Sequence, residues 1–207
     1  MRVNGSSRAI EHFLQAIQEY VHAIVKERVD KIEHHVETID EYIINRRKTS
    51  ATNVTYAMLE YAHCLDIPDK IRQNSIIVEL RAAGNDILSW TNDIYSFPVE
   101  DSRAHLHNFV FVTMHNNRVH LQDAVDYVYQ RIQSRVREYS ALKAQLPSFG
   151  PRLDRYTAQY VQGIEYIIQA CNEWCFLTPR YLGNRAKEVK ETGVVELQPP
   201  VTIDEII

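Results

Sequence analysis

The sequence predicts an all-α fold made of several amphipathic helices. Apolar residues recur at steps of three and four along most of the 207 residues, which is the spacing of one helix face. No segment shows the apolar–polar alternation of a strand, and neither an internal repeat nor a Gly-rich phosphate loop occurs. Because the connections are short, neighbouring helices are expected to run antiparallel.

The first three predicted helices fall before Pro68. Ser6 or Ser7 suits the N-cap of the first, whose apolar positions are Ile10, Phe13, Leu14, Ile17, Tyr20, Val21, Ile24 and Val25. A second, shorter helix begins at Thr38 and closes in the basic run 46–48. A third passes through residues 58–61 and stops before the proline.

Residues 75 to about 99 form the next predicted helix, which carries the candidate site. Gly84 within it is expected to allow a close backbone approach or a local break. Pro98 removes the N–H that would bond the Ile94 carbonyl, so the helix is expected to kink or end there.

The rest of the chain continues in helices. A long pattern runs from 109 to about 146 with an interruption at 116–117, and after the turn at 147–151 a last helix spans roughly 155–176. Beyond Gly183 the sequence is polar, and a loosely ordered tail is expected. We therefore predict one helical domain over residues 1–183 and a tail over 184–207.

Composition narrows the function classes. A net charge of −4 gives no electrostatic footprint for nucleic acid, and no apolar run reaches membrane-spanning length. The first fourteen residues lack the apolar core of a signal peptide. Three cysteines, Cys64, Cys171 and Cys175, indicate a reducing compartment, and the last two are expected to pack in the core. We expect a cytoplasmic protein with no nucleic-acid partner and no membrane span.

A polar seam formed by Asn92, Ser96 and Glu100 lies on the otherwise apolar helix 75–99. The i, i+4, i+8 spacing puts the three on one face, rising about 12 Å over two turns. An amide oxygen, a hydroxyl and a carboxylate are hard donors that suit Mg²⁺. A solvated seam, with Ser and Asn bonded back to the helix, would give the same letters, and spacing alone does not decide between the two.

Resemblance to a known family favours the metal. Residues 83–96, Ala-Gly-Asn-Asp-Ile-Leu-Ser-Trp-Thr-Asn-Asp-Ile-Tyr-Ser, resemble class I terpene synthases, and fungal sesquiterpene synthases most of all. Asn92, Ser96 and Glu100 match the metal-binding motif N-D-x-x-S-x-x-x-E of that family letter for letter. An earlier triplet, Asn85, Ser89 and Asp93, has the same spacing but ends in Asp, so the later one is preferred.

The resemblance also implies a diphosphate-binding set of Arg46, Arg180 and Tyr181. Arg46 lies 46 positions before Asn92, a separation that resembles that of the family's diphosphate-sensing Arg. The alternative is that Arg46 only complements the helix dipole at the C-terminus of the second helix. Arg180-Tyr181 is similar to the family's C-terminal Arg-Tyr pair. By the same resemblance, residues 49–50 form the break that links diphosphate sensing to ionisation.

One family signature is absent. No adjacent acidic pair is followed by the further acid that the family's aspartate-rich motif requires. The resemblance runs from about residue 8 to 183 and corresponds to the C-terminal part of the domain, so we expect the N-terminal helices to be missing. The histidines, including His34, His35, His105 and His107, are expected at the surface without an acid–base role.

The sequence thus predicts an incomplete class I terpene synthase domain. The implied chemistry is Mg²⁺-dependent ionisation of a prenyl diphosphate, with farnesyl diphosphate favoured, and cyclisation of the carbocation to a sesquiterpene. The chain is expected to be inactive alone and to self-associate through bared apolar faces. One alternative is a non-catalytic helical interaction module or pseudoenzyme. A prenyltransferase is the other, although it would carry a second aspartate-rich motif in place of the polar seam.

Overall fold

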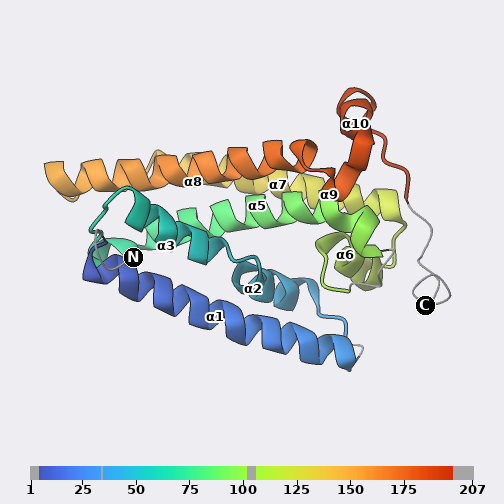
Figure 1. Ribbon diagram of the computed structural model, residues 1–207, viewed down its shortest axis with the longest axis horizontal. Coiled ribbons are helices and arrows are strands. Elements are labelled where there is room, and N and C mark those ends of the chain that lie inside the picture. The colour runs from blue at the N-terminus through green and yellow to red at the C-terminus, as the bar shows by residue number, and fades with distance from the viewer. Residues whose placement is uncertain (1–4, 34, 102–105, 198–207) are drawn as a thin grey trace.

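The computed structural model describes residues 5–33, 35–101 and 106–197, and every regular element within these ranges is helical (Figure 1). The elements are α1 (Ser7–Ile32), α2 (Ile39–Thr49), α3 (Thr52–Ala62), α4 (Asp69–Arg72), α5 (Ser75–Asp101), α6 (Phe109–Asn117), α7 (Leu121–Lys143), α8 (Pro151–Leu177), α9 (Pro179–Leu182), the 3-10 turn η1 (Gly183–Arg185) and α10 (Ala186–Thr192). The all-α prediction is confirmed. None of the helices in the described ranges is long and apolar enough to cross a membrane.

The first helix begins at one of its predicted caps, and Thr38, the predicted start of the second helix, is the N-cap of α2. Ser6 Oγ accepts the backbone N–H of Ala9 at 3.1 Å at the start of α1. Thr38 and Glu41 form a capping box at the start of α2, in which Glu41 Oε2 accepts the Thr38 N–H at 2.9 Å. Both arrangements satisfy N–H groups that have no partner within the helix.

Helix α5 lies across the middle of the molecule (Figure 1). It packs against α7 and α8 on one side and against α2 and α3 on the other, and α1 covers α2 and α3 from outside. The helix that carries the candidate site is therefore held by other helices on both sides.

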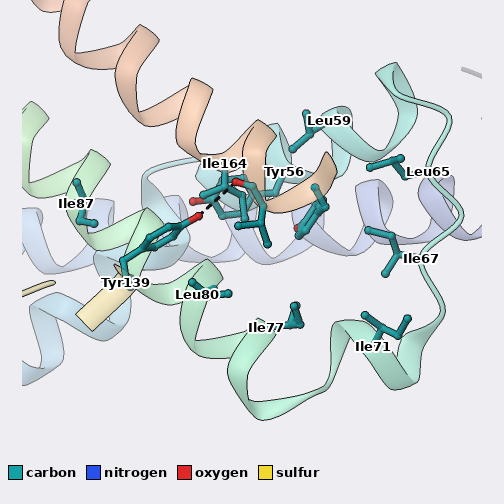
Figure 2. Packing of buried hydrophobic residues seen from close by; sticks show 13 residues of the cluster. Tyr56, Leu59, Leu65, Ile67, Ile71, Ile77, Leu80, Ile87, Tyr139 and Ile164 are labelled. Carbon is teal, nitrogen blue, oxygen red and sulfur yellow. Dashed lines mark hydrogen bonds between the residues drawn. The ribbon is translucent and has the colours of Figure 1, made fainter. Parts of the chain in front are cut away.

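One buried apolar cluster joins α3, α5, α7 and α8 (Figure 2). Gly84 of α5 lies within it, and a Cβ at that position would stand 2.7 Å from Tyr56 Oη and 2.8 Å from Ile164 Cγ2. The predicted close approach at Gly84 is confirmed, and α5 continues through it without a break. Tyr139 Oη donates to the Val161 carbonyl at 3.3 Å and ties α7 to α8.

A second buried cluster joins α2, α5, α6 and α7 below the polar seam. The Phe109 ring is central, with its centroid 5.2 Å from that of Tyr42 and 5.1 Å from that of Trp90. Aromatic packing of this kind contributes large buried apolar areas, so it fixes α2 and the start of α6 against α5.

Pro98 neither ends nor breaks α5, which continues to Asp101. The helix is held on both sides of the proline, because Phe97 is buried in the second cluster and Asn108 Nδ2 donates to Glu100 Oε2 and to the Asp93 carbonyl, each at 2.9 Å. Tertiary contacts thus offset the lost backbone hydrogen bond. Glu100 consequently stays on the same helix as Asn92 and Ser96.

The start of α8 and the presence of the short helices α10 and α4 differ from the prediction. Helix α8 begins at Pro151 rather than near 155, since proline suits the first helical position and Asp154 accepts the Phe149 N–H at 2.5 Å. Within residues 184–207, which the sequence predicts to be a loosely ordered tail, Ala186–Thr192 form α10, whose Val189 is buried. Helix α4 was not predicted, because four residues are too few for a periodic pattern.

Two histidines are not surface residues. His12 is buried, with Nδ1 2.7 Å from Glu60 Oε2 and Nε2 3.1 Å from Asp69 Oδ1, so it joins α1, α3 and α4. His107 is half-buried, and its Nδ1 lies 3.2 Å from Glu37 Oε2. Buried carboxylates, which sequence periodicity does not reveal, draw both rings inward. His34 and His105 lie outside the described residues.

Candidate functional site

The polar seam lies on α5, where Asn92 contacts Arg46 of α2 and Glu100 contacts Asn108 at the start of α6. Ser96 is buried, and Asn92 and Glu100 are half-buried. Two acids on the same helix, Asp86 and Asp93, are also buried, and each is paired with an arginine from α2. The interface of α2 with α5 is therefore polar and charged, although apolar residues surround it.

The earlier triplet is committed to structural hydrogen bonds. Asn85 Oδ1 accepts the Ser50 hydroxyl at 2.9 Å, and Asn85 Nδ2 donates to the Arg47 carbonyl at 2.7 Å. Ser89 Oγ donates to the Asp86 carbonyl at 3.5 Å, and Asp93 is paired with Arg46. Asn85 and Asp93 hold the end of α2 on α5, whereas the Ser89 bond stays within α5. The preference for Asn92, Ser96 and Glu100 as metal ligands stays a prediction.

Arg46 is the centre of the site's charge network. Its Nη2 lies 2.6 Å from Asp93 Oδ1 and 3.0 Å from Asn92 Oδ1, and its Nε lies 3.0 Å from the same Asp93 oxygen. Burial alone would lower the pKa of the Arg46 guanidinium, but the Asp93 charge outweighs burial and raises that pKa above its ordinary value. Arg46 is therefore a permanent cation beside the first seam residue.

Asp93 has a full set of partners. Its Oδ2 accepts the Tyr42 hydroxyl and, at 3.2 Å, the Phe109 backbone N–H. Burial and the Asp93 charge raise the pKa of Tyr42, so the phenol stays protonated and donates. Asp93, Tyr42 and Asn108 were not among the predicted site residues. The sequence offered two signals for Asp93 and Asn108, namely an acid directly after Asn92 and an Asn directly before the apolar run 109–112.

Tyr181 joins the network and Arg180 does not. Asn92 Nδ2 donates to Tyr181 Oη at 3.0 Å, so Arg46, Asn92 and Tyr181 form a continuous chain of contacts from α2 through α5 to α9. The exposed Arg180 side chain places its guanidinium carbon 5.5 Å from the Tyr181 ring centroid. The structure thus joins Arg46, Asn92 and Tyr181 by direct contacts, and Ser96 and Glu100 lie on the same helix as Asn92. Arg180, the sixth predicted residue, contacts this group within the described residues only through Tyr181.

Ser96 is the seam residue without a partner. Its Oγ is buried and has no hydrogen bond to any residue that the structure describes. Most buried hydroxyls are satisfied, so an orphaned one calls for a ligand or a water. Asn92 Oδ1 and Glu100 Oε2 each accept one hydrogen bond and keep further lone pairs. The three oxygens fit a hard divalent cation by chemistry, and their convergence on one ion stays a prediction.

The break between α2 and α3 is fixed to α5. Helix α2 ends at Thr49, Ala51 takes a left-handed φ of 58°, and α3 starts at Thr52. Ser50 Oγ accepts the Thr52 N–H at 3.2 Å while it donates to Asn85. Ser50 lies four residues after Arg46 and bonds Asn85 of α5. A movement of this break would therefore act directly on α5.

A cavity separate from the polar seam is also present. It measures about 490 Å³, lies between α5, α7 and α8, and is lined mainly by apolar and aromatic side chains such as Ile87, Tyr95 and Ile132. Cys171 also lines it, whereas Cys175 is buried as expected. None of the six predicted site residues lines this cavity.

Comparison with protein families gives one match over most of the chain. A family model described as terpene synthase family 2, C-terminal metal binding, matches residues 1–138. Sesquiterpene synthase Agr1 of Cyclocybe aegerita is 36% identical over 197 residues, which are 95% of this chain and 57% of that protein. Alpha-muurolene synthase of Coprinopsis cinerea is 38% identical over 159 residues, 77% of this chain and 37% of that protein. The chain thus spans about half the length of the curated relatives it matches.

Solved structures show the same fold. A linalool/nerolidol synthase from Streptomyces clavuligerus superposes with a TM-score of 0.77 at 18% identity, over 84% of this chain and 62% of that one. An α-eudesmol synthase gives a TM-score of 0.75 at 19% identity, over 84% of this chain and 57% of that one. At such identities the likeness concerns the fold.

Proposed function

The chain belongs to terpene synthase family 2, and from that membership we propose that it forms the diphosphate-binding side of a Mg²⁺-dependent sesquiterpene synthase site. The substrate class is a prenyl diphosphate, with farnesyl diphosphate favoured. The reaction is ionisation of the carbon–oxygen bond to diphosphate, followed by cyclisation of the carbocation. Relatives named sesquiterpene synthases support this assignment. We keep the expectation that the protein is cytoplasmic and binds no nucleic acid.

The observation that carries the proposal is the buried, unpartnered hydroxyl of Ser96 in the described structure. Asn92, Ser96 and Glu100 would hold Mg²⁺, each through a side-chain oxygen. Bound there, the ion supplies positive charge that offsets the negative charge developing on the departing diphosphate.

Arg46 binds the diphosphate in this proposal. Within the described residues its Nη1 has no hydrogen-bond partner, while Nε and Nη2 are held by Asp93 and Asn92. A guanidinium fixed in this way presents its free N–H groups in a set direction, and it stays charged at every relevant pH. The Tyr181 hydroxyl and the Arg180 guanidinium add donors from α9. Asp93 and Tyr42 act as positioning residues for Arg46.

We further propose that the 207-residue chain does not cyclise farnesyl diphosphate unaided. A diphosphate clamped from one side keeps only part of the electrostatic stabilisation of the leaving group, and an open site lets water capture the carbocation. The test is incubation of the chain with farnesyl diphosphate and Mg²⁺, with product analysis by gas chromatography and a Mg²⁺-free control. We expect no cyclic hydrocarbon. A cyclic product formed at a rate typical of enzymes would refute catalytic incompleteness.

A non-catalytic interaction module is the second candidate, and the outer face of α1 favours it. Leu14, Val25 and Ile32 on that face are 60%, 58% and 66% exposed. An apolar surface of this kind marks an interaction site or a cause of self-association. Sedimentation velocity at rising concentration tests this candidate. Val25→Asp should suppress self-association, whereas Val78→Asp, at an exposed position on α5, should not. Equal behaviour of both variants would exclude the α1 face.

A further inference from the structure

A second cavity, which is polar, lies between α2, α5 and α7, apart from the polar seam. It measures about 180 Å³ and is lined by Ile43, Arg47, Asp86, Trp90, Arg131, Ser134, Arg135 and Glu138. It contains none of Arg46, Asn92, Ser96, Glu100, Arg180 and Tyr181. Its chemistry is therefore independent of the terpene synthase proposal.

Most of the acidic charge in this cavity is already neutralised. Asp86 is fully buried and accepts Arg47 Nε and Nη2, each at 2.7 Å, together with Arg135 Nε at 2.9 Å. Glu138 accepts Arg135 Nη1 at 2.5 Å and the Ser134 hydroxyl at 3.3 Å. Three guanidinium groups face two carboxylates, so the lining carries one excess positive charge.

Several donors around the cavity have no acceptor. The Trp90 side chain is 1% exposed, and its indole Nε1–H has no hydrogen-bond partner among the described residues. Arg135 Nη2 is likewise buried without a hydrogen bond there, and it lies 3.8 Å from Glu79 Oε2. Arg131 makes no hydrogen bond or ion pair within the described ranges, and its guanidinium carbon lies 5.8 Å from the Trp90 ring centroid. Two buried donors, Trp90 Nε1 and Arg135 Nη2, and the exposed Arg131 guanidinium thus call for a ligand that has only acceptor atoms.

We propose that this cavity is a binding site for a phosphoryl oxyanion, either orthophosphate or inorganic diphosphate. Such an anion has only acceptor oxygens, fits within about 180 Å³, and pairs with planar guanidinium groups through two parallel hydrogen bonds. Arg131 is its exposed contact, and Trp90 and Arg135 supply the buried donors. Tight pairing with Asp86 keeps Arg47 and Arg135 in place whether or not the anion is bound.

The site would act on the last turn of α2. Arg46 and Arg47 are adjacent, yet Arg46 pairs with Asp93 and Arg47 pairs with Asp86, seven residues earlier on α5. Because Arg47 lines the cavity, an anion held by Trp90, Arg131 and Arg135 would fix the turn that also carries Arg46. Occupancy of the cavity couples α7 to the polar seam through α2.

The test uses the intact chain and the two tryptophans it contains. Trp174→Phe leaves Trp90 as the only tryptophan, so its emission reports on the cavity. Orthophosphate and inorganic diphosphate are titrated separately without Mg²⁺ at constant ionic strength, and calorimetry is run in parallel. We expect saturable binding of at least one anion. Stronger binding of diphosphate would identify a condensed phosphate as the ligand, and the reverse would identify orthophosphate.

Arg131→Gln removes the exposed contact and leaves Asp86 and its partners intact. The affinity should fall roughly tenfold or more, as expected for loss of a charge-assisted contact. Arg137→Gln, which changes an exposed arginine of α7 outside the cavity, should bind as the wild type does. The proposal is overturned if neither anion gives saturable heat or fluorescence change, or if the two variants lose affinity equally. Arg131 does not contact Arg46, so either result leaves the terpene synthase proposal standing.

Discussion

Arg46 of α2 donates two hydrogen bonds to the same carboxylate oxygen of Asp93, from Nη2 at 2.6 Å and from Nε at 3.0 Å. Both side chains are nearly removed from solvent, with exposed fractions of 14% and 1%. The pair joins residues 47 positions apart and sets the direction of the guanidinium that we assign to the diphosphate. Removing either partner would leave the other as an uncompensated charge in a buried place.

Asp93→Asn is therefore expected to destabilise the fold severely. The loss of one partner from a buried ion pair is typically about 3–5 kcal/mol, and urea unfolding monitored by circular dichroism measures it. Lys143→Gln serves as the control, because its pair with Glu165 lies at the surface and should contribute about 1 kcal/mol or less. Similar losses in the two variants would contradict a special role for Asp93.

Gly84→Ala should destabilise the core between α3, α5 and α8. The added Cβ would stand 2.7 Å from Tyr56 Oη and 2.8 Å from Ile164 Cγ2, and overpacking of this kind amounts to roughly 1–3 kcal/mol. The Tyr56 hydroxyl is buried without a hydrogen bond in the described structure, so Tyr56→Phe removes one clash at little loss. Thermal unfolding of the double variant should show partial recovery. An unchanged defect would place the strain elsewhere.

Glu37 predicts a loss of stability in acid. Burial alone would raise the pKa of Glu37, but hydrogen bonds from His107, Asn45 and Lys26 outweigh burial and lower that pKa to about 2. The folded state therefore favours the carboxylate, and this stability is present above pH 4.5, falling as the pH drops toward 2. The contribution is on the order of 3 kcal/mol. Urea unfolding at pH 7 and pH 3 should show a smaller pH effect in Glu37→Gln than in the wild type. An identical effect would contradict the shift.

Local signals in the sequence located the helices well. Ser6 caps α1 as predicted, and α2 begins directly after Thr38, where the second helix was predicted to start, because N-capping depends on one side chain and its next three residues. The continuation of α5 past Pro98 could not be predicted from neighbouring residues in the sequence. It depends on Asn108, which binds the last turns of α5 from the start of α6, and on burial of Phe97.

The candidate site was predictable only as far as spacing and family resemblance reach. Both identify Asn92, Ser96 and Glu100, and resemblance adds Arg46 and Tyr181, which the structure joins through Asn92. The roles of Asp93 and Tyr42 could not be read from the sequence, because they arise where α2 crosses α5. The same holds for the cavity at Trp90 and Arg131, whose residues come from three helices.

Binding of inorganic diphosphate with and without Mg²⁺ tests the central claim most directly. Calorimetry is performed on the Arg131→Gln chain, in which anion binding at the cavity near Trp90 is expected to be weakened roughly tenfold or more, and on the same chain with Ser96→Ala added. Because Ser96 Oγ has no partner in the described residues, Ser96→Ala should leave the free energy of unfolding within about 0.5 kcal/mol of its parent. We expect diphosphate binding that requires Mg²⁺ and that weakens roughly tenfold in the Ser96→Ala variant. Binding of equal strength without Mg²⁺, or unaffected by Ser96→Ala, would contradict a metal site at the polar seam.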